Sequence, residues 1–294
     1  MNLTRNEYEK LKKTAYVSDE GYLFRNPYKK DSVIKTISYL PWAPMYQDIK
    51  LYTIRLLLEN RELLSSLKIS LPEELTTIES VVKGCERSYI EGCNLSVKLS
   101  DETIPIETRI DYLKQVGSIL RDMSYIRKTT CLTNFFYNDI HEDNFIVGTN
   151  GIVQGIDIDS CSIKDNIPSN ALYPSLLAEY ISKDSKYQTC DRISCYTAKI
   201  IPDENLDLYC YIRMIINFMV GKQIDNLDKD FLLEYLNFLE YYGANQELLY
   251  SLSRIYDDKI PNENPDYLLE YIKEIYPYSN IHYDKTGYLS KVLK

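Results

Sequence analysis

Apolar and polar residues alternate in short stretches up to residue 90 and recur at helical spacing beyond it. Turn-forming residues separate three of the alternating stretches, which predicts a three-stranded meander over 16–37. In the last of these strands, Val33, Lys35 and Ile37 share one face, because alternate residues of a strand point to the same side. The first part of the chain is therefore predicted to be rich in β-structure.

One helix interrupts this β-rich part, and the apolar spacing places it over 47–64. Pro72 ends the helical tendency, and two further strands are predicted, over 76–80 and 81–90. The helical residues spaced to share one side are Tyr52, Leu56, Glu59 and Leu63.

Helical periodicity dominates after residue 90. A long helix is predicted over 108–127, a hairpin over 144–156, and further helices from Leu206 onwards. Residues 160–202 have weak periodicity and are predicted to form a long irregular segment, which in a compact domain is usually functional. The buried stripe of the long helix is predicted to comprise Ile110, Leu113, Val116, Leu120, Met123 and Ile126. Two later helical stripes are predicted in 231–240 and 267–275.

Composition and charge exclude several classes of protein for this chain. The chain has 294 residues, 45% hydrophobic and 26% charged, which is a globular balance, and its net charge of −9 disfavours a general nucleic-acid binder. Two histidines, His141 and His282, exclude a His-rich metal site. The most apolar helical stretch, 208–220, is shorter than a membrane span. Seven scattered cysteines without a Cys-x-x-Cys pair, and an N-terminus without an apolar signal segment, predict a cytoplasmic protein.

The candidate chemistry lies in Tyr137-Asn138-Asp139-Ile140-His141-Glu142-Asp143-Asn144 and, after the hairpin, in Ile156-Asp157-Ile158-Asp159. Asp139, Asn144 and Asp157 stand at the ends of short strands that the hairpin brings back together. Carboxylate and amide oxygens near one point suit Mg²⁺ with substrate phosphates. A carboxylate set apart from the metal ligands can orient an attacking hydroxyl group.

At these residues the chain resembles the protein-kinase-like superfamily, whose catalytic loop reads His-Arg-Asp-x-x-x-x-Asn and is followed through a hairpin by Asp-Phe-Gly. The resemblance implies that Asp139 is the catalytic base, that Asn144 is a metal ligand, and that Asp157 bridges metal and phosphates, with ATP and Mg²⁺ bound. It also implies an α+β, two-lobed protein-kinase-like fold, with a small β-rich N-lobe over 1–92 and a larger helical C-lobe over 93–294.

Other parts of the family pattern are found at the expected separations. Lys35 precedes Asp139 by about a hundred residues, as the family's phosphate-binding strand lysine does, and is expected to pair with Glu59, or with Glu62, on the helix. Residues 88–95 resemble the linker between the lobes. Asp207 resembles the aspartate that braces the catalytic loop. The resemblance further assigns four residues to nucleotide binding, namely Gly21, Val33, Ser88 and Ile90.

Several residues depart from the protein-kinase pattern, so the pattern does not decide which molecule accepts the phosphoryl group. Tyr137 and Asn138 replace the loop His-Arg, Arg87 stands where an apolar gatekeeper is usual, and no Ala-Pro-Glu motif follows. His141 and Asp159 are similar to the loops of aminoglycoside and choline phosphotransferases.

Three functions follow from this pattern. The first is a Ser/Thr protein kinase, in which the acceptor is a protein. The second is a small-molecule kinase with a small hydroxylated acceptor, and the third is a nucleotide-binding pseudokinase scaffold. The reduction of the glycine-rich loop to Gly21 favours the third, and the retained Lys35, Asp139, Asn144 and Asp157 oppose it.

Overall fold

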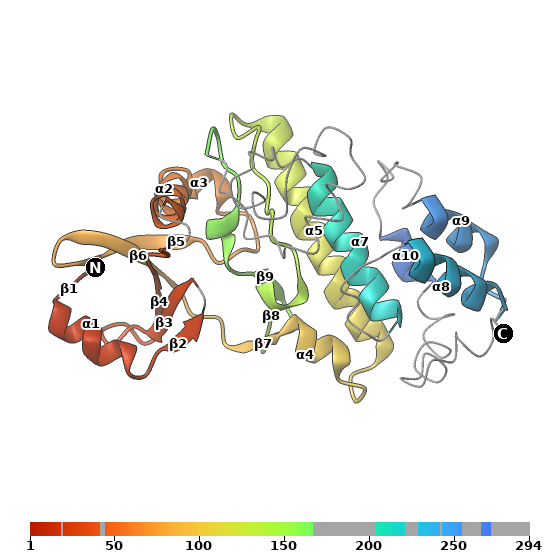
Figure 1. The fold of residues 1–294 in the computed structure, drawn as a ribbon, viewed down its shortest axis with the longest axis horizontal. Coiled ribbons are helices and arrows are strands. Elements are labelled where there is room, and N and C mark those ends of the chain that lie inside the picture. The colour runs from red at the N-terminus through yellow and green to blue at the C-terminus, as the bar shows by residue number, and fades with distance from the viewer. Residues whose placement is uncertain are drawn as a thin grey trace.

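The chain forms a mixed α+β structure with a six-stranded sheet in its N-terminal part and helices after it (Figure 1). The computed structural model describes residues 1–18, 20–41, 45–166, 204–220, 229–241, 243–254 and 266–271. Within these residues, no helix combines the length and the apolar character that crossing a membrane requires.

The N-terminal sheet has the strand order β1-β5-β6-β4-β3-β2. Neighbouring strands are antiparallel except β1, which pairs with β5 in parallel. The predicted meander is confirmed as β2, β3 and β4. The predicted strand after Pro72 begins at that proline itself. The strands are β1 (Asn2–Leu3), β2 (Tyr16–Ser18), β3 (Gly21–Arg25), β4 (Ser32–Ile37), β5 (Pro72–Ile78) and β6 (Val81–Ser88).

The pairing of β4 with β6 brings two basic residues together on the sheet. Lys35 lies opposite Cys85, and Val33 lies opposite Arg87. Lys35 and Arg87 are both buried. Because they lie on adjacent strands and both contact one carboxylate, they project to the same side of the sheet.

The predicted helix over 47–64 is two helices, α2 (Tyr46–Glu59) and α3 (Arg61–Leu64), with Asn60 between them. Of the four residues predicted to share one side, Leu56 is buried, whereas Tyr52, Glu59 and Leu63 are exposed. The buried side of α2 includes a lysine, Lys50, which an apolar periodicity does not select. The other buried residues of α2 are Tyr46, Gln47, Thr53, Ile54 and Leu57.

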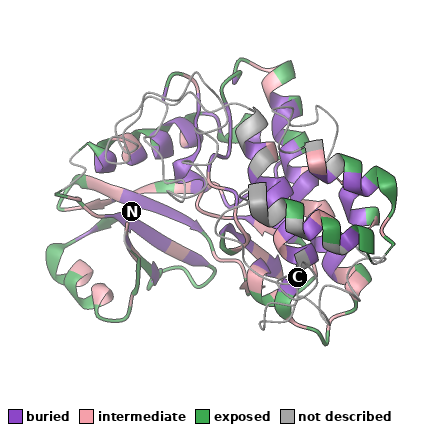
Figure 2. Ribbon diagram, turned by 45° about the vertical axis from the view of Figure 1, so that its right-hand side comes forward, coloured by how far each residue is buried: buried purple, intermediate pink, exposed green. Residues whose placement is uncertain are grey.

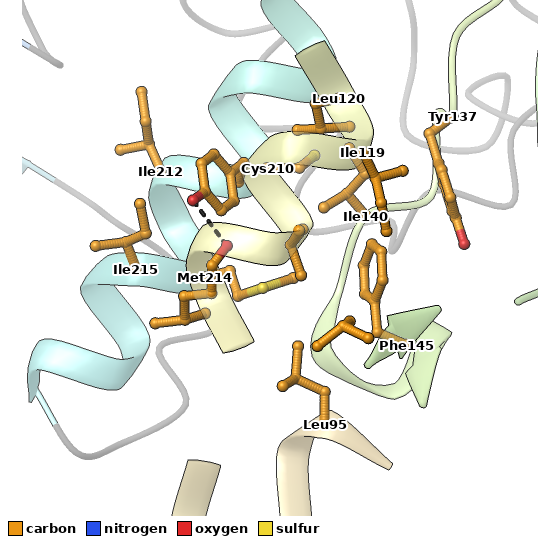
Figure 3. Close-up of a cluster of buried hydrophobic side chains, with 14 of the residues drawn as sticks. Leu95, Ile119, Leu120, Tyr137, Ile140, Phe145, Cys210, Ile212, Met214 and Ile215 are labelled. Atoms are coloured by element: carbon orange, nitrogen blue, oxygen red, sulfur yellow. Dashed lines mark hydrogen bonds between the residues drawn. The ribbon is translucent and has the colours of Figure 1, made fainter. Parts of the chain in front are cut away.

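The remaining elements surround a long central helix, α5, whose predicted buried stripe is confirmed at all six residues. Helices α5 and α7 lie side by side, and their apolar residues meet those around Ile140 and Phe145 (Figures 1 and 3). A three-stranded sheet, β7-β8-β9, contains the predicted hairpin. These elements are β7 (Gly92–Asn94), α4 (Leu95–Ser100), α5 (Ile106–Thr129), β8 (Phe145–Gly148), β9 (Val153–Gly155), α7 (Glu204–Val220), α8 (Lys229–Tyr241), α9 (Gln246–Arg254) and α10 (Tyr267–Glu270).

The burial pattern separates the core from a peripheral helix. Strand β4 is almost entirely buried and α5 buries one side, whereas β2 and α1 (Arg5–Lys12) contain no buried residue (Figure 2). The predicted stripe 231–240 lies within α8. Of the predicted irregular segment only 160–166 is described, and residues 272–275 of the last predicted stripe also lie outside the described residues.

Adjacent leucines of α3 test the corrected orientation of this helix. Leu64 is fully buried, whereas Leu63 is 45% exposed. We expect Leu64→Ala to lower the free energy of unfolding by about 2–5 kcal/mol, because it leaves a cavity in the core. The matched change Leu63→Ala should alter it by about 0.5 kcal/mol or less. Urea denaturation measures both values, and equal losses would contradict the orientation described here.

Candidate functional site

The loop between α5 and β8 carries the candidate chemistry and is fixed by α7. Asp207, buried at the start of α7, accepts hydrogen bonds from the backbone N–H groups of Tyr137 (2.9 Å) and Asn138 (2.8 Å). Asn138 has a left-handed backbone conformation (φ 68°), which asparagine tolerates better than most residues. The expected bracing of this loop by Asp207 is therefore present as two direct contacts.

Tyr137 connects this loop to the end of the hairpin. Its ring stacks on Phe145 at 5.5 Å between ring centroids (Figure 3). Its hydroxyl donates to the carbonyl of Ile156 and lies 3.2 Å from the carbonyl of Asn144. Gly155 accommodates this ring, because a Cβ there would lie 2.9 Å from the Tyr137 hydroxyl. The aromatic residue thus fixes the loop against the strand that leads to Asp157.

Asp139 and Asn144 contact each other directly. The Asn144 amide Nδ2 donates to the Asp139 backbone carbonyl (2.8 Å) and to its carboxylate Oδ2 (2.9 Å). His141 Nε2 lies 3.7 Å from the other carboxylate oxygen of Asp139. Burial raises the pKa of the Asp139 carboxyl to about 6, although His141, Lys50 and the Asn144 hydrogen bond act in the opposite direction. A carboxyl group with this pKa can both accept and release a proton near neutral pH.

Asp157 follows β9 and completes the predicted oxygen-bearing set. The backbone N–H of Ile156 donates to the carbonyl of Asn144 at 2.8 Å, so the two loops are directly joined. Asp157 has a left-handed backbone (φ 58°), and such conformations cluster at functional sites. Its Oδ1 accepts a hydrogen bond from Lys35 Nζ at 2.9 Å, while the side chain stays 41% exposed. The structure therefore pairs Asp139 with Asn144 and Asp157 with Lys35, and a backbone hydrogen bond from Ile156 to Asn144 joins the two loops.

A second carboxylate, Asp159, lies completely buried among three cations. Arg87 Nη2 is 2.5 Å from its Oδ1, and Lys35 Nζ and Lys50 Nζ are 3.1 Å and 3.4 Å from its Oδ2. Burial opposes ionisation of Asp159, but the attraction of Lys35, Lys50 and Arg87 outweighs it and holds the pKa well below its ordinary value. Arg87 and Asp159 thus form an ion pair with each other.

Glu20, in the turn between β2 and β3, extends this cluster. Its Oε2 is 2.7 Å from Lys50 Nζ and 3.5 Å from Lys35 Nζ, and its Oε1 accepts a hydrogen bond from the Tyr46 hydroxyl. We call Glu20, Lys35, Lys50, Arg87, Asp157 and Asp159 the ion cluster. Sequence reasoning missed Glu20, Tyr46 and Lys50. A lysine at helical spacing from Tyr46, Ile54 and Leu57 was the available signal.

The expected pairing of Lys35 with Glu59 is wrong. Glu59 is exposed at the end of α2, and Glu62 is also exposed. The carboxylates within 4.0 Å of Lys35 Nζ belong instead to Glu20, Asp157 and Asp159. The side of α2 that faces the candidate site carries a lysine, so the helix contributes a positive charge where a negative one was expected.

The four further residues assigned to nucleotide binding lie in or next to the large sheet. Gly21 is a glycine because a Cβ there would lie 1.8 Å from the Thr36 carbonyl oxygen of the paired strand. The Ser88 hydroxyl donates to Glu73, and Val33 and Ile90 are partly buried. None of the four makes a polar side-chain contact with the ion cluster. Their role in nucleotide binding stays a prediction.

The oxygen atoms left available fit a magnesium ion that completes its coordination with phosphates and water. Neither Asn144 Oδ1 nor Asp157 Oδ2 makes a hydrogen bond with a described residue. Mg²⁺ is commonly held by one or two protein oxygens together with phosphate oxygens. The part of the chain that the structure describes contains no group of three or more His, Cys, Asp or Glu residues that could hold a metal by itself.

Comparison of the chain with protein-family models finds no match, and comparison with curated protein sequences finds no relative.

The largely buried Asp139 carboxyl, whose side chain is 13% exposed, gives a measurable pKa. We expect its carboxyl ¹³C resonance, assigned by its absence in Asp139→Asn, to titrate with a midpoint near pH 6 in the ligand-free protein. The folded protein holds this proton more tightly than the unfolded chain does. The free energy of unfolding of the wild type, relative to Asp139→Asn, should therefore fall as the pH rises from about 4 to about 6. A midpoint near the ordinary value of 3.8 would contradict the burial described for this group.

Proposed function

We propose that the chain is an ATP-dependent phosphotransferase with a two-lobed protein-kinase-like fold, which transfers the γ-phosphoryl group of Mg-ATP to a hydroxyl group. One observation carries the proposal, namely the direct connection of Asp139 to Asn144 and of Asp157 to Lys35, within two loops that are joined to each other. These are the residue types that such a transfer needs, because it depends on positioning and on charge neutralisation.

Each residue has a distinct role in this reaction. Lys35 binds phosphate oxygens of ATP, and Asn144 Oδ1 and Asp157 Oδ2 are the atoms that would hold Mg²⁺, which supplies neutralising charge when bound. Asp139 accepts the hydrogen bond of the acceptor hydroxyl. A bond forms between the acceptor oxygen and the γ-phosphorus, the bond from that phosphorus to the leaving oxygen of ADP breaks, and the hydroxyl proton passes to the Asp139 carboxylate.

The pKa of Asp139 supports this assignment. A base must be ionised to accept a proton, and a value near 6 leaves the carboxylate mostly ionised at neutral pH while its basicity exceeds that of an ordinary aspartate. The Asn144 amide holds one carboxylate oxygen and leaves the other for the acceptor or for His141. The protein's own hydrogen bonds thus orient the proposed base.

We infer that the acceptor is a protein serine or threonine, with a small hydroxylated molecule as the second candidate. The contact between His141 and Asp139 (3.7 Å) supports the second candidate, because it places a polar ring beside the proposed base where an acceptor would approach. A binding-only scaffold is supported by the ion cluster, in which each cation already has an anionic partner. One phosphate-transfer assay distinguishes these three functions, because it shows whether phosphate is transferred and whether the acceptor is a protein or a small molecule.

Asp139→Asn should separate catalysis from binding. With γ-labelled ATP, Mg²⁺ and cell lysate separated into proteins and metabolites, we expect the wild type to label one fraction and the variant to be slower by a factor of about 10² or more. ATP affinity should stay within about threefold, because the carboxylate acts on the acceptor. Asp122→Asn, an exposed aspartate of α5, is the matched control. Absence of labelling by the wild type in both fractions would leave only the scaffold.

Asp157→Asn tests the metal assignment independently of the acceptor. We expect the dependence of ATP affinity on Mg²⁺ to be lost in this variant, because an amide binds Mg²⁺ less well than a carboxylate does. Isothermal titration with ATP at zero and millimolar Mg²⁺ measures this dependence. An unchanged response to Mg²⁺ would show that Asp157 does not hold the ion.

A further inference from the structure

The Glu20 carboxylate is held by donors from two different elements and is, with Asp157, one of the two partly exposed carboxylates of the ion cluster. Lys50 Nζ and the Tyr46 hydroxyl come from α2, and Lys35 Nζ comes from β4. The backbone of Glu20 is fixed as well, since Ser38 N–H donates to its carbonyl at 2.8 Å. A polar ring of two ammonium groups and one hydroxyl thus surrounds a single oxyanion.

Exposure differs sharply between the carboxylate and the groups that hold it. The Glu20 side chain is 25% exposed, whereas those of Lys50 and Lys35 are 1% and 7% exposed. Glu20 therefore covers the solvent side of Lys50. Lys50 also contacts Ser160 (2.8 Å) and Asp159 (3.4 Å), and neither of these contacts involves Glu20.

The charge balance of the ion cluster points to an anionic ligand. Lys35, Lys50 and Arg87 face Glu20, Asp157 and Asp159, so the six charges cancel in the ligand-free structure. Burial opposes ionisation of Glu20, but Lys50 and Lys35 outweigh it and lower its pKa, so the group is an anion at neutral pH. When Glu20 turns outward, the remaining groups carry one uncompensated positive charge. Buried cations without a partner are costly, so this state favours another oxyanion.

We propose that Lys50 is a second phosphate-binding lysine beside Lys35, and that the Glu20 carboxylate occupies, in the ligand-free protein, the position that a phosphate group of the nucleotide takes. A phosphate oxygen makes the same charge-assisted hydrogen bonds to ammonium and hydroxyl donors as a carboxylate oxygen does. This inference rests on the proposed function, because it names further residues of the same nucleotide site. Glu20 then acts as an internal competitor that lowers the apparent affinity for phosphates.

Neutralising Glu20 tests the competition directly. The full chain is titrated calorimetrically with ATP and, separately, with inorganic tripolyphosphate. We expect Glu20→Gln to tighten binding of both by about tenfold, since a site that is open a tenth of the time loses that factor in affinity. Glu62→Gln, an exposed glutamate of α3, is the matched control and should leave both affinities unchanged.

Removing Lys50 tests the second lysine. We expect Lys50→Met to weaken binding of both ligands by about tenfold or more and to abolish the gain in the double variant with Glu20→Gln. The control is Lys68→Met at an exposed lysine. Because Lys50 is buried, its variant is checked by near-ultraviolet circular dichroism. If it does not fold, the Glu20→Gln titration alone decides the inference.

The outcomes separate the inference from the proposed function. If the wild type binds these ligands and Glu20→Gln binds them equally well or more weakly, the role given to Glu20 is overturned. A Glu20→Gln gain that survives in a folded double variant would overturn the role given to Lys50. Failure of every folded form to bind either ligand at millimolar concentration would overturn the proposed function itself, and the inference with it.

Discussion

The structure depends on a single buried carboxylate. Asp159 is fully buried, and it is neutralised by Arg87 from β6, Lys35 from β4 and Lys50 from α2. It therefore ties the large sheet and the helix that packs on it to the segment after β9. Removing one partner from a buried charged group costs about 3–5 kcal/mol, so these four residues constrain one another strongly.

The candidate site takes its geometry from this constraint. Asp157 lies two positions before Asp159 and shares Lys35 with it, so the fixed carboxylate also positions the accessible one. On the other side, Asp207 and Tyr137 hold the loop that carries Asp139 and Asn144. The loop that carries Asp139 and the segment that carries Asp157 are thus each fixed by contacts with a separate part of the fold. Asp139, Asn144 and Asp157 are therefore held in place before any ligand binds, which is the preorganisation that the proposed transfer needs, and Glu20 is the side chain proposed to move.

Periodicity in the sequence was sufficient for much of the fold. The meander, the hairpin and the buried stripe of α5 were predicted correctly, because each buries apolar residues at a regular spacing. The grouping of Asp139 with Asn144 and the bracing of their loop by Asp207 were predicted from a resemblance in spacing, whereas the contact of Lys35 with Asp157 was not. The inner side of α2 could not be predicted in this way. It carries Lys50, whose burial is stabilised by carboxylates distant in the sequence, and apolar periodicity gives no sign of such partners.

The most direct test of this account is a crystal structure of the full chain with Mg²⁺ and a non-hydrolysable ATP analogue. The proposed roles predict that phosphate oxygens of the analogue contact Lys35 and that Asn144 and Asp157 hold a metal ion. They also predict the Asp139 carboxylate facing the terminal phosphate. Phosphates bound elsewhere, with the contacts of Lys35 to Asp157 and Glu20 unchanged, would contradict them.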